Sequence, residues 1–229
     1  MLAVHGPLLR SGPMRVIAVP VKALGRSKSR LHPLLSPLER AALTLAMLAD
    51  VLDATLSVPG WDTWVVSPDE AVLEIAARRR ARAVLEEKPP LSAALRQAED
   101  EALERGADAL AVVPADLPLL SAATLADAVH TLGPVVVAPS ADGGGTNFLL
   151  RRPPKAMPAR FGRDSFHKHL EGARSRGLPA SVVDWPELTF DLDTEGDLPR
   201  LLSESHPGRT LETCRELGVA ARLVARTSS

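Results

Sequence analysis

The stretch that decides the fold is Leu110-Ala111-Val112-Val113-Pro114-Ala115-Asp116-Leu117-Pro118-Leu119-Leu120. Its uninterrupted apolar run predicts a β-strand buried on both faces, which is typical of a parallel sheet covered by helices. In open α/β sheets, ligands bind at the carboxyl ends of such strands. Asp116 follows the strand and precedes a proline, so we expect it either to open a turn or to hold a ligand at that edge.

Other apolar runs alternate with helical patterns along the rest of the chain. Strands are predicted at 15–20, 64–66, 81–85, 135–138 and 148–150, with further candidates at 181–183 and 188–191. Two helices should open in capping-box form, at Ser36-Pro37-Leu38-Glu39 and at Ser67-Pro68-Asp69-Glu70. Within the first of them, the spacing of apolar residues predicts a buried face formed by Leu38, Ala42, Leu45, Ala49, Leu52 and Leu56.

This alternation also predicts the domain organisation. It is typical of a single three-layer α/β domain, which we expect to span residues 14–204. A loose extension is expected over residues 1–13. A short helix with a frayed tail is expected over residues 205–229.

Composition and charge limit the classes of function. The chain has 229 residues, 45% of them hydrophobic, and a net charge of −1, which fits one large domain with a proper core. The near-neutral balance argues against a general nucleic-acid or membrane-surface binder. A single cysteine, Cys214, excludes an intrachain disulfide and a multi-cysteine metal site. Because the sequence shows no signal peptide and no long apolar span, we expect a cytoplasmic protein.

The first candidate site is the basic loop after the first predicted strand. Lys22, Arg26, Lys28 and Arg30 lie close together in it. At the carboxyl end of a strand such cations can hold a triphosphate, although a solvated loop is the plain alternative. The chain has neither the Gly-x-x-x-x-Gly-Lys-Ser/Thr pattern of P-loop hydrolases nor the Gly-x-Gly-x-x-Gly pattern of dinucleotide-binding proteins, so both classes are disfavoured.

The second candidate site is a pair of carboxylates. Asp191 and Asp193 alternate with Leu192 in a predicted strand, so both should point the same way. Together with Asp116, Asp193 would make a two-carboxylate Mg²⁺ site that leaves positions for water and a substrate phosphate. The alternative for Asp193 is that it caps the helix predicted after it.

The third candidate site combines a glycine loop with a helix start. Residues 142–147 contain three consecutive glycines, whose N–H groups would form a nest for an oxyanion, and Thr146 adds a hydroxyl. A flexible hairpin is the alternative. Gly162 and Ser165 lie where a helix begins, which is a favourable place for an anion. The two segments together could hold a small phosphorylated or carboxylated acid. His167 and His169 lie two apart on that helix and do not form a ligand pair.

Several short motifs recur in the order of a known family. They are Pro20-Val21-Lys22, Lys28-Ser29-Arg30-Leu31, Leu35-Ser36-Pro37, Val66-Ser67-Pro68-Asp69, Pro114-Ala115-Asp116-Leu117-Pro118, Gly145-Thr146-Asn147, Arg160-Phe161-Gly162 with Ser165, and Asp191-Leu192-Asp193-Thr194. On these motifs, residues 14–204 resemble the phosphoenolpyruvate/2-phospho-L-lactate guanylyltransferases of deazaflavin coenzyme F-420 biosynthesis. The resemblance implies the nucleotide-diphospho-sugar transferase fold, an α/β/α sandwich with a mostly parallel mixed sheet.

The resemblance also implies an activity and the residues that carry it. The family transfers GMP from GTP to a three-carbon phospho-acid with the help of Mg²⁺, and a homodimer is consistent with it. Asp116 and Asp193 match its metal carboxylates, and Lys22, Lys28 and Asp116 its catalytic positions. The positions that match GTP-binding residues are Lys22, Arg26, Lys28, Ser67, Asp69 and Ser92, and those that match phospho-acid-binding residues are Thr146, Gly162 and Ser165. Two positions depart from the family pattern, since Gly144 replaces a frequent threonine and Ser92 a frequent asparagine.

Two alternative functions stay open at this level. Another nucleotidyltransferase of the same fold, such as a molybdopterin guanylyltransferase or a sugar-phosphate cytidylyltransferase, usually has a Gly-rich, Arg-containing signature after its first strand. Pro20-Val21-Lys22 stands there instead. A non-catalytic nucleotide sensor is the other alternative, and the presence of both Asp116 and Asp193 argues against it.

Overall fold

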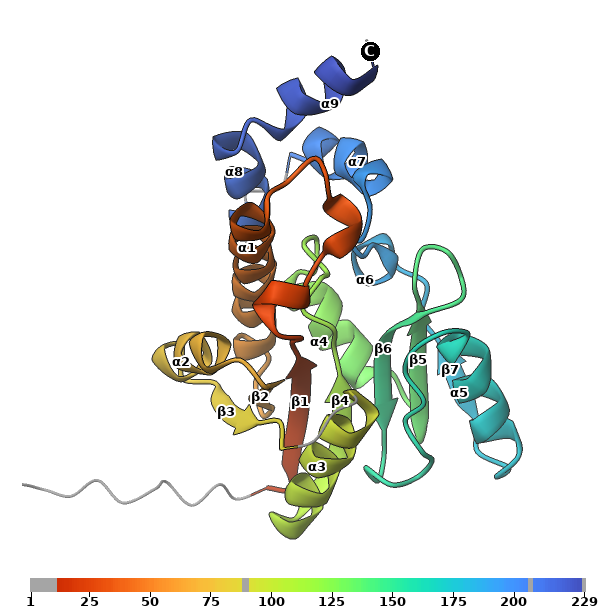
Figure 1. Cartoon of the computed structure of the whole chain (residues 1–229). Coiled ribbons are helices and arrows are strands. Elements are labelled where there is room, and N and C mark those ends of the chain that lie inside the picture. Colours follow the sequence, from red (N-terminus) through yellow and green to blue (C-terminus); the bar gives the residue numbers. More distant parts are fainter. Residues whose placement is uncertain (1–11, 88–90, 206–207, 228–229) are drawn as a thin grey trace, which may run out of the picture.

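The computed structural model describes residues 12–87, 91–205 and 208–227. Its centre is a seven-stranded sheet in the order β3-β2-β1-β4-β6-β5-β7 (Figure 1). The strands are β1 (Met14–Pro20), β2 (Asp62–Ser67), β3 (Arg82–Leu85), β4 (Ala107–Val112), β5 (Val135–Pro139), β6 (Thr146–Arg151) and β7 (Ala180–Val182). In these ranges only β6 runs antiparallel to its neighbours, β4 and β5. The sheet is therefore mixed and mostly parallel, as predicted.

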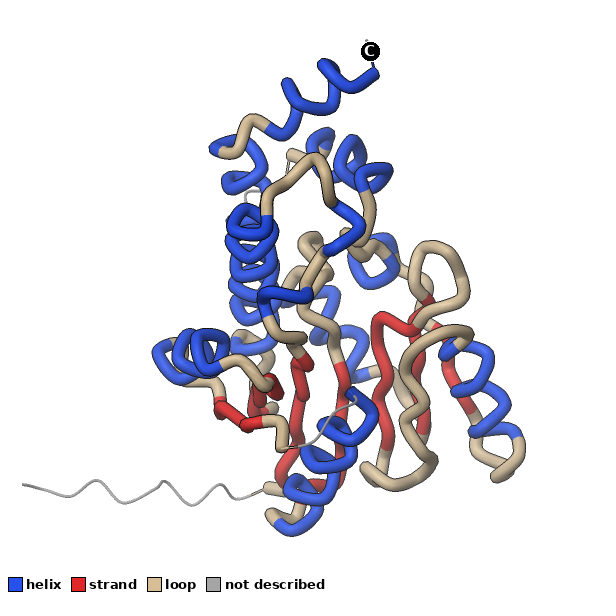
Figure 2. Tube along the Cα trace, in the orientation of Figure 1, coloured by secondary structure: helices blue, strands red, loops and turns tan. Residues whose placement is uncertain are grey.

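Helices cover both faces of the sheet, which gives three layers (Figures 1 and 2). One face carries α1 (Pro37–Leu56), α2 (Glu70–Arg78), α4 (Ala122–His130) and α6 (Pro186–Thr189), over the largest apolar cluster. The other face carries α3 (Leu91–Glu104) and α5 (Ser165–Arg174), over two smaller clusters. The predicted α/β sandwich is thus confirmed. None of the helices described is both long and apolar enough to cross a membrane.

Side-chain caps explain where two helices begin. The Ser36 hydroxyl accepts the Glu39 N–H, while the Glu39 carboxylate accepts the Ser36 N–H, so α1 starts with the predicted capping box. The prediction for α2 is wrong in its cap. Asp69 is the N-cap and accepts the Ala71 N–H, whereas Ser67 ends β2 and accepts the Asp69 N–H through its hydroxyl.

The predicted buried face of α1 is correct only in part. Leu52 is fully buried as expected, but Leu38 is 80% exposed, and the unpredicted Leu43 and Met47 are fully buried. The cause is a second packing partner. α1 meets the sheet on one side and C-terminal helices on another, so its apolar stripe is wider than a single face.

The C-terminal segment differs from the expected helix and frayed tail. α7 (Leu198–Ser203) and α8 (Arg209–Glu216) are followed by a further helix, α9 (Val219–Thr227). These helices lie beyond the end of the sheet (Figure 1). Their apolar side chains, including Cys214 of α8, form a cluster with Met47 of α1. The Asp50 carboxylate of α1 accepts the Arg209 and Thr210 N–H groups, which satisfies the first turn of α8.

Candidate active site

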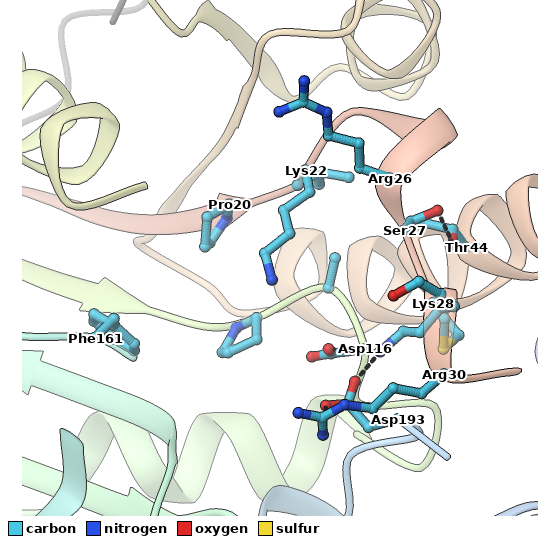
Figure 3. A pocket seen from close by; sticks show the side chains of 15 residues that line it. Pro20, Lys22, Arg26, Ser27, Lys28, Arg30, Thr44, Asp116, Phe161 and Asp193 are labelled. Carbon is cyan, nitrogen blue, oxygen red and sulfur yellow. Dashed lines mark hydrogen bonds and ion pairs between the residues drawn. The ribbon is translucent and has the colours of Figure 1, made fainter. Parts of the chain in front are cut away.

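A pocket of about 380 Å³ lies at the carboxyl ends of β1 and β4 (Figure 3). The loop after β1, which contains the short 3₁₀ turns η1 (Leu24–Arg26) and η2 (Ser29–Leu31), supplies much of its wall. Six residues of the predicted sites line this pocket together: Lys22, Arg26, Lys28, Arg30, Asp116 and Asp193. Arg26 extends away from the two carboxylates, while Lys28 points at both of them (Figure 3).

The Lys28 ammonium lies between the two predicted metal carboxylates. Its Nζ donates hydrogen bonds to Asp116 Oδ2 at 2.8 Å and to Asp193 Oδ1 at 2.7 Å. The lysine side chain is 7% exposed, whereas the Asp116 and Asp193 side chains are 29% and 44% exposed. Arg30 Nη1 lies 3.8 Å from Asp193 Oδ2. Two carboxylates from separate loops therefore converge on one cation and keep their exposed side toward the pocket.

These contacts shift the pKa values of the charged groups. Burial by itself would lower the pKa of Lys28, but Asp116 and Asp193 outweigh burial and raise that pKa above its ordinary value. Burial would raise the pKa of Asp193, yet Lys28, followed by Arg30 and Lys22, lowers it. Lys28 and Asp193 are therefore both charged at neutral pH.

Backbone geometry brings the two carboxylates together. The Leu192 N–H donates to the Asp116 carbonyl oxygen at 3.0 Å, which joins the loop after β4 to the segment that carries Asp193. The Asp193 N–H donates to Asp197 Oδ2, at the end of the 3₁₀ turn η3 (Glu195–Asp197). Lys28 has a φ of 48°, a left-handed conformation that is uncommon for a residue with a side chain. The ion pair therefore rests on a fixed backbone arrangement.

Asp191 and Asp193 do not share a face, contrary to the prediction. Pro186 starts α6, so the segment expected as a strand at 188–191 is helical as far as Thr189 and irregular after it. Asp193 turns into the pocket, whereas Asp191 Oδ1 accepts a hydrogen bond from the Asn147 amide at 3.0 Å. The same amide donates to the Thr189 carbonyl oxygen. Burial raises the pKa of Asp191. The two bonds of the Asn147 amide attach α6 and the residues after it to β6.

Three residues predicted to bind GTP lie outside the lining of the pocket. Ser67 is fully buried. Asp69 Oδ2 accepts the Leu24 N–H at 3.0 Å and so anchors the basic loop to the start of α2. Ser92 is half-buried at the second position of α3, and part of the loop before it, residues 88–90, lies outside the described residues. Contact of these three side chains with GTP stays a prediction.

The glycine loop is filled by its own side chains, so the predicted oxyanion nest is wrong. The Gly144 and Gly145 N–H groups donate to Asp142 Oδ1 at 2.9 and 3.3 Å, and Gly145 also donates to Ser140 Oγ at 2.7 Å. The Gly143 N–H donates to the Ser140 carbonyl oxygen. The Ser140 hydroxyl and these N–H groups lower the pKa of Asp142. The chain's own carboxylate occupies the nest and closes a compact turn.

A β-bulge directs Thr146 toward α5. Phe148 pairs with Ala138 and Thr146 pairs with Pro139, which leaves Asn147 as the extra residue in β6. Asn147 and Phe148 consequently both contact the α6 side of the sheet, and Thr146 faces the other side. Simple alternation along the strand would have placed Thr146 with Phe148.

The three predicted phospho-acid-binding residues come together at the start of α5. The Ser165 hydroxyl donates to Thr146 Oγ1 at 3.0 Å, and the Ser165 N–H donates to the Gly162 carbonyl oxygen at 3.1 Å. Gly162 has a φ of 113°, which a side chain would strain. Phe161, directly before it, lines the pocket described above (Figure 3). The cluster predicted to bind the phospho-acid therefore borders the basic pocket through Phe161.

Sequence reasoning missed two supporting residues. Thr44 of α1 contacts Ser27 of the basic loop, with 2.9 Å between their hydroxyl oxygens; a threonine among the apolar residues of α1 was the available signal. His169 is fully buried, and its Nδ1 lies 3.0 Å from Thr146 Oγ1. The signal for His169 was its spacing of four from Ser165, which puts both on one face of α5.

The sheet order and the position of the pocket define the class, which is the nucleotide-diphospho-sugar transferase fold. A solved structure from Desulfovibrio desulfuricans G20, assigned as a nucleotide-diphospho-sugar transferase, superposes with a TM-score of 0.76. It is 22% identical in sequence, and the match covers 91% of this chain and 97% of that chain. This likeness confirms the predicted fold.

Sequence comparison gives the family. The model of the family described as "Guanylyl transferase CofC like" matches residues 14–228. The phosphoenolpyruvate guanylyltransferase of Rubrobacter xylanophilus is 45% identical over 192 residues, covering 82% of this chain and 94% of the relative. The 2-phospho-L-lactate guanylyltransferase of Methanothermobacter thermautotrophicus is 39% identical over 202 residues, covering 87% and 89%. The chain belongs to the CofC-like guanylyl transferase family, which confirms the resemblance seen in its motifs.

Proposed function

We propose that the protein transfers GMP from GTP to the phosphate of phosphoenolpyruvate and releases pyrophosphate, as a step of coenzyme F-420 biosynthesis. 2-Phospho-L-lactate is the alternative acceptor. The proposal rests on the pocket, in which four cations accompany two convergent carboxylates, in a member of this family. We prefer phosphoenolpyruvate as the acceptor because two relatives named phosphoenolpyruvate guanylyltransferase are 45% and 42% identical to this chain. The 2-phospho-L-lactate guanylyltransferase described above is 39% identical.

The reaction needs positioning and charge stabilisation more than proton transfer. An oxygen of the acceptor phosphate attacks the α-phosphorus of GTP, and the bond from that phosphorus to the β-phosphate oxygen breaks. Because the attacking oxygen is already ionised, no general base is required. The barrier comes from repulsion between two anions and from charge on the leaving pyrophosphate. Lys22, Arg26 and Lys28 are suited to offset both, since they line the pocket as cations.

Asp116 and Asp193 fit a Mg²⁺ ion, which when bound would supply further neutralisation of phosphate charge. The fit rests on the Lys28 ammonium, a cation that both carboxylates already hold at 2.8 and 2.7 Å. The described part of the chain contains no group of three or more His, Cys, Asp or Glu residues suited to a metal. Such a sparse donor set matches a Mg²⁺ site completed by water and phosphate oxygens. Release of Lys28 from the carboxylates would free its ammonium for the triphosphate.

Thr146, Gly162 and Ser165 are proposed to bind the phospho-acid. Their cluster borders the pocket through Phe161, so an acceptor held there would lie next to a triphosphate held by the basic loop. Hydroxyl and backbone N–H groups are suitable donors for a carboxylate or a phosphate.

The test is pyrophosphate release by the purified protein with GTP and Mg²⁺, using phosphoenolpyruvate, 2-phospho-L-lactate and phosphoglycerate separately. We expect release with phosphoenolpyruvate or 2-phospho-L-lactate, and a product whose mass equals the acid plus GMP. Faster release with CTP than with GTP would favour a cytidylyltransferase instead. Nucleotide binding without any release would favour a sensor. The cytoplasmic location and the homodimer stay predictions.

A further inference from the structure

The proton positions on His169 follow from its two partners. Its Nε2 lies 2.8 Å from the Arg160 backbone nitrogen, and its Nδ1 lies 3.0 Å from Thr146 Oγ1. A backbone N–H can only donate, so Nε2 must be the unprotonated, accepting nitrogen. A neutral imidazole then carries its proton on Nδ1 and donates it to Thr146 Oγ1.

The surroundings keep this ring neutral. Burial lowers the pKa of His169 to about 4, and the positive charges of Arg151 and Arg160 act in the same direction. Arg151 is itself paired with Glu99 of α3. Phe161 packs edge-on against the imidazole, with 5.2 Å between ring centroids. The ring is therefore a fixed donor on one side and a fixed acceptor on the other at neutral pH.

The proton on His169 Nδ1 determines how the hydroxyls of Thr146 and Ser165 can donate their hydrogen bonds. Thr146 and Ser165 hold two hydroxyl protons between them, and one is used in the bond that joins them. Because the Nδ1–H points at Thr146 Oγ1, neither hydroxyl can give its proton to the histidine. Among the described residues no other acceptor contacts either hydroxyl oxygen. One O–H of the pair is therefore left without an acceptor among the described residues.

We propose that His169 is a positioning residue of the phospho-acid site. Through Nδ1 it orients the Thr146–Ser165 hydroxyl pair so that one O–H is offered to the acid, and through Nε2 it holds the 160–162 turn. His169 is fully buried and acts only through these neighbours. The inference rests on the proposed function, which assigns the acid to this cluster.

Two substitutions separate the two contacts of the ring. His169→Asn keeps an amide N–H near the place of Nδ1 and can still donate to Thr146, but it leaves the Arg160 N–H without its acceptor. His169→Gln puts an amide oxygen near the place of Nε2, so it keeps that acceptor and loses the donor. We expect His169→Gln to raise the KM for phosphoenolpyruvate ~10-fold, as for one lost hydrogen bond that orients the site. The KM for GTP should stay within about twofold in both variants, and His169→Asn, which loses only the contact that holds the turn, should raise the acid KM less than His169→Gln does.

A measurement without substrate tests the same inference. Nitrogen NMR of the wild-type protein labelled with ¹⁵N-histidine should show His169 as the Nδ1–H tautomer, unchanged from about pH 6 to about pH 8. The His169→Gln spectrum identifies the signal among the six histidines.

Three results would overturn the inference: an Nε2–H tautomer, an unchanged acid KM in His169→Gln, or equal increases of KM for GTP and acid in both variants. If the wild-type protein releases no pyrophosphate with any acid, the proposed function fails, while the tautomer still tests the role of His169.

Discussion

Replacing Lys28 by methionine should strengthen metal binding by the nucleotide-free protein and at the same time reduce turnover. The ammonium donates to Asp116 and Asp193 at 2.8 and 2.7 Å, and its side chain is 7% exposed, so both bonds form largely out of water. A hydrogen bond between charged groups contributes about 1.5 to 3 kcal/mol. At the lower end, two such bonds give about 3 kcal/mol, or ~100-fold in the affinity of a cation that competes with the ammonium.

Manganese is a suitable probe, because the electron paramagnetic resonance signal of free Mn²⁺ is lost on binding. Lys28→Met and the wild-type protein would be titrated without nucleotide. Lys22→Met is the matched control, since Lys22 lines the same pocket and acts on Asp193 only at a distance. We expect ~100-fold tighter binding for Lys28→Met and a change of no more than about threefold for Lys22→Met. In the pyrophosphate assay, Lys28→Met should lose at least ~100-fold in turnover, the scale of a lost preorganised charge contact.

The result that refutes this reasoning is Mn²⁺ binding by Lys28→Met that is no tighter than binding by Lys22→Met. In that case Lys28 would hold the two carboxylates in position and would not compete with a metal. Thermal unfolding of all three proteins checks that the variants fold.

Four further predictions concern the rest of the site. Asp116→Asn should cut turnover by at least ~100-fold while leaving the unfolding temperature near that of the wild type; a normal rate at limiting Mg²⁺ would contradict the metal assignment. Ser165→Ala should raise the KM for the phospho-acid and leave that for GTP little changed, and equal losses for both would count against it. Gly145→Ala should lower the free energy of unfolding by about 1 to 3 kcal/mol, because its Cβ would lie 2.5 Å from Ser140 Oγ; urea titration checks this, with Gly25→Ala, which has open space, as the control. The free energy of unfolding should also fall as pH drops from about 6.5 to about 4, since the unfolded chain binds a proton there that His169 in the folded chain does not. This share is on the order of 3 kcal/mol, and a His169→Gln protein that loses the same amount over that range would contradict it.

The strands and helices were predictable where local pattern and burial agree. The run at 110–113 is apolar because helices cover both faces of β4, so its sequence alone indicates its surroundings. The buried face of α1 was not predictable in the same way. Met47 is covered by the C-terminal helices, and no local spacing carries information on a partner so far away in the chain. The structure of residues 188–191 was also not predictable from local pattern. Leu188 and Phe190 are both buried, and their spacing fits a strand as well as a helical turn, whereas Pro186 favours the turn that is observed.

The grouping of the basic loop with Asp116 and Asp193 in one pocket was predictable from the sequence, but the contacts within it were not. Asp116, Lys22 and Lys28 follow strand ends, and the edge of a parallel sheet brings such residues together. A backbone hydrogen bond from the Leu192 N–H to the Asp116 carbonyl oxygen sets the separation of the two carboxylates. Such a bond involves no side chain, so the sequence does not indicate it. The occupied glycine nest could have been foreseen, because an aspartate two residues before a glycine often accepts its N–H in a turn. The bulge in β6 could not, since a strand with one extra residue has the same composition as one without it.

The candidate site has two parts, one proposed for GTP and one proposed for the phospho-acid, and they use different kinds of donor. The chemistry of the proposed substrates explains why. The GTP part carries four cations against two carboxylates, which suits a triphosphate but would also hold any other polyanion, including the pyrophosphate that leaves. The phospho-acid part offers a hydroxyl pair and a buried neutral imidazole. Neutral donors with fixed directions discriminate by geometry more than by charge, so they can distinguish a small acid from pyrophosphate. Protonation of His169 Nε2 would set a second donor against the Arg160 N–H, break that hydrogen bond and add charge to that part. The buried, neutral state of His169 therefore matters for the proposed acceptor selection.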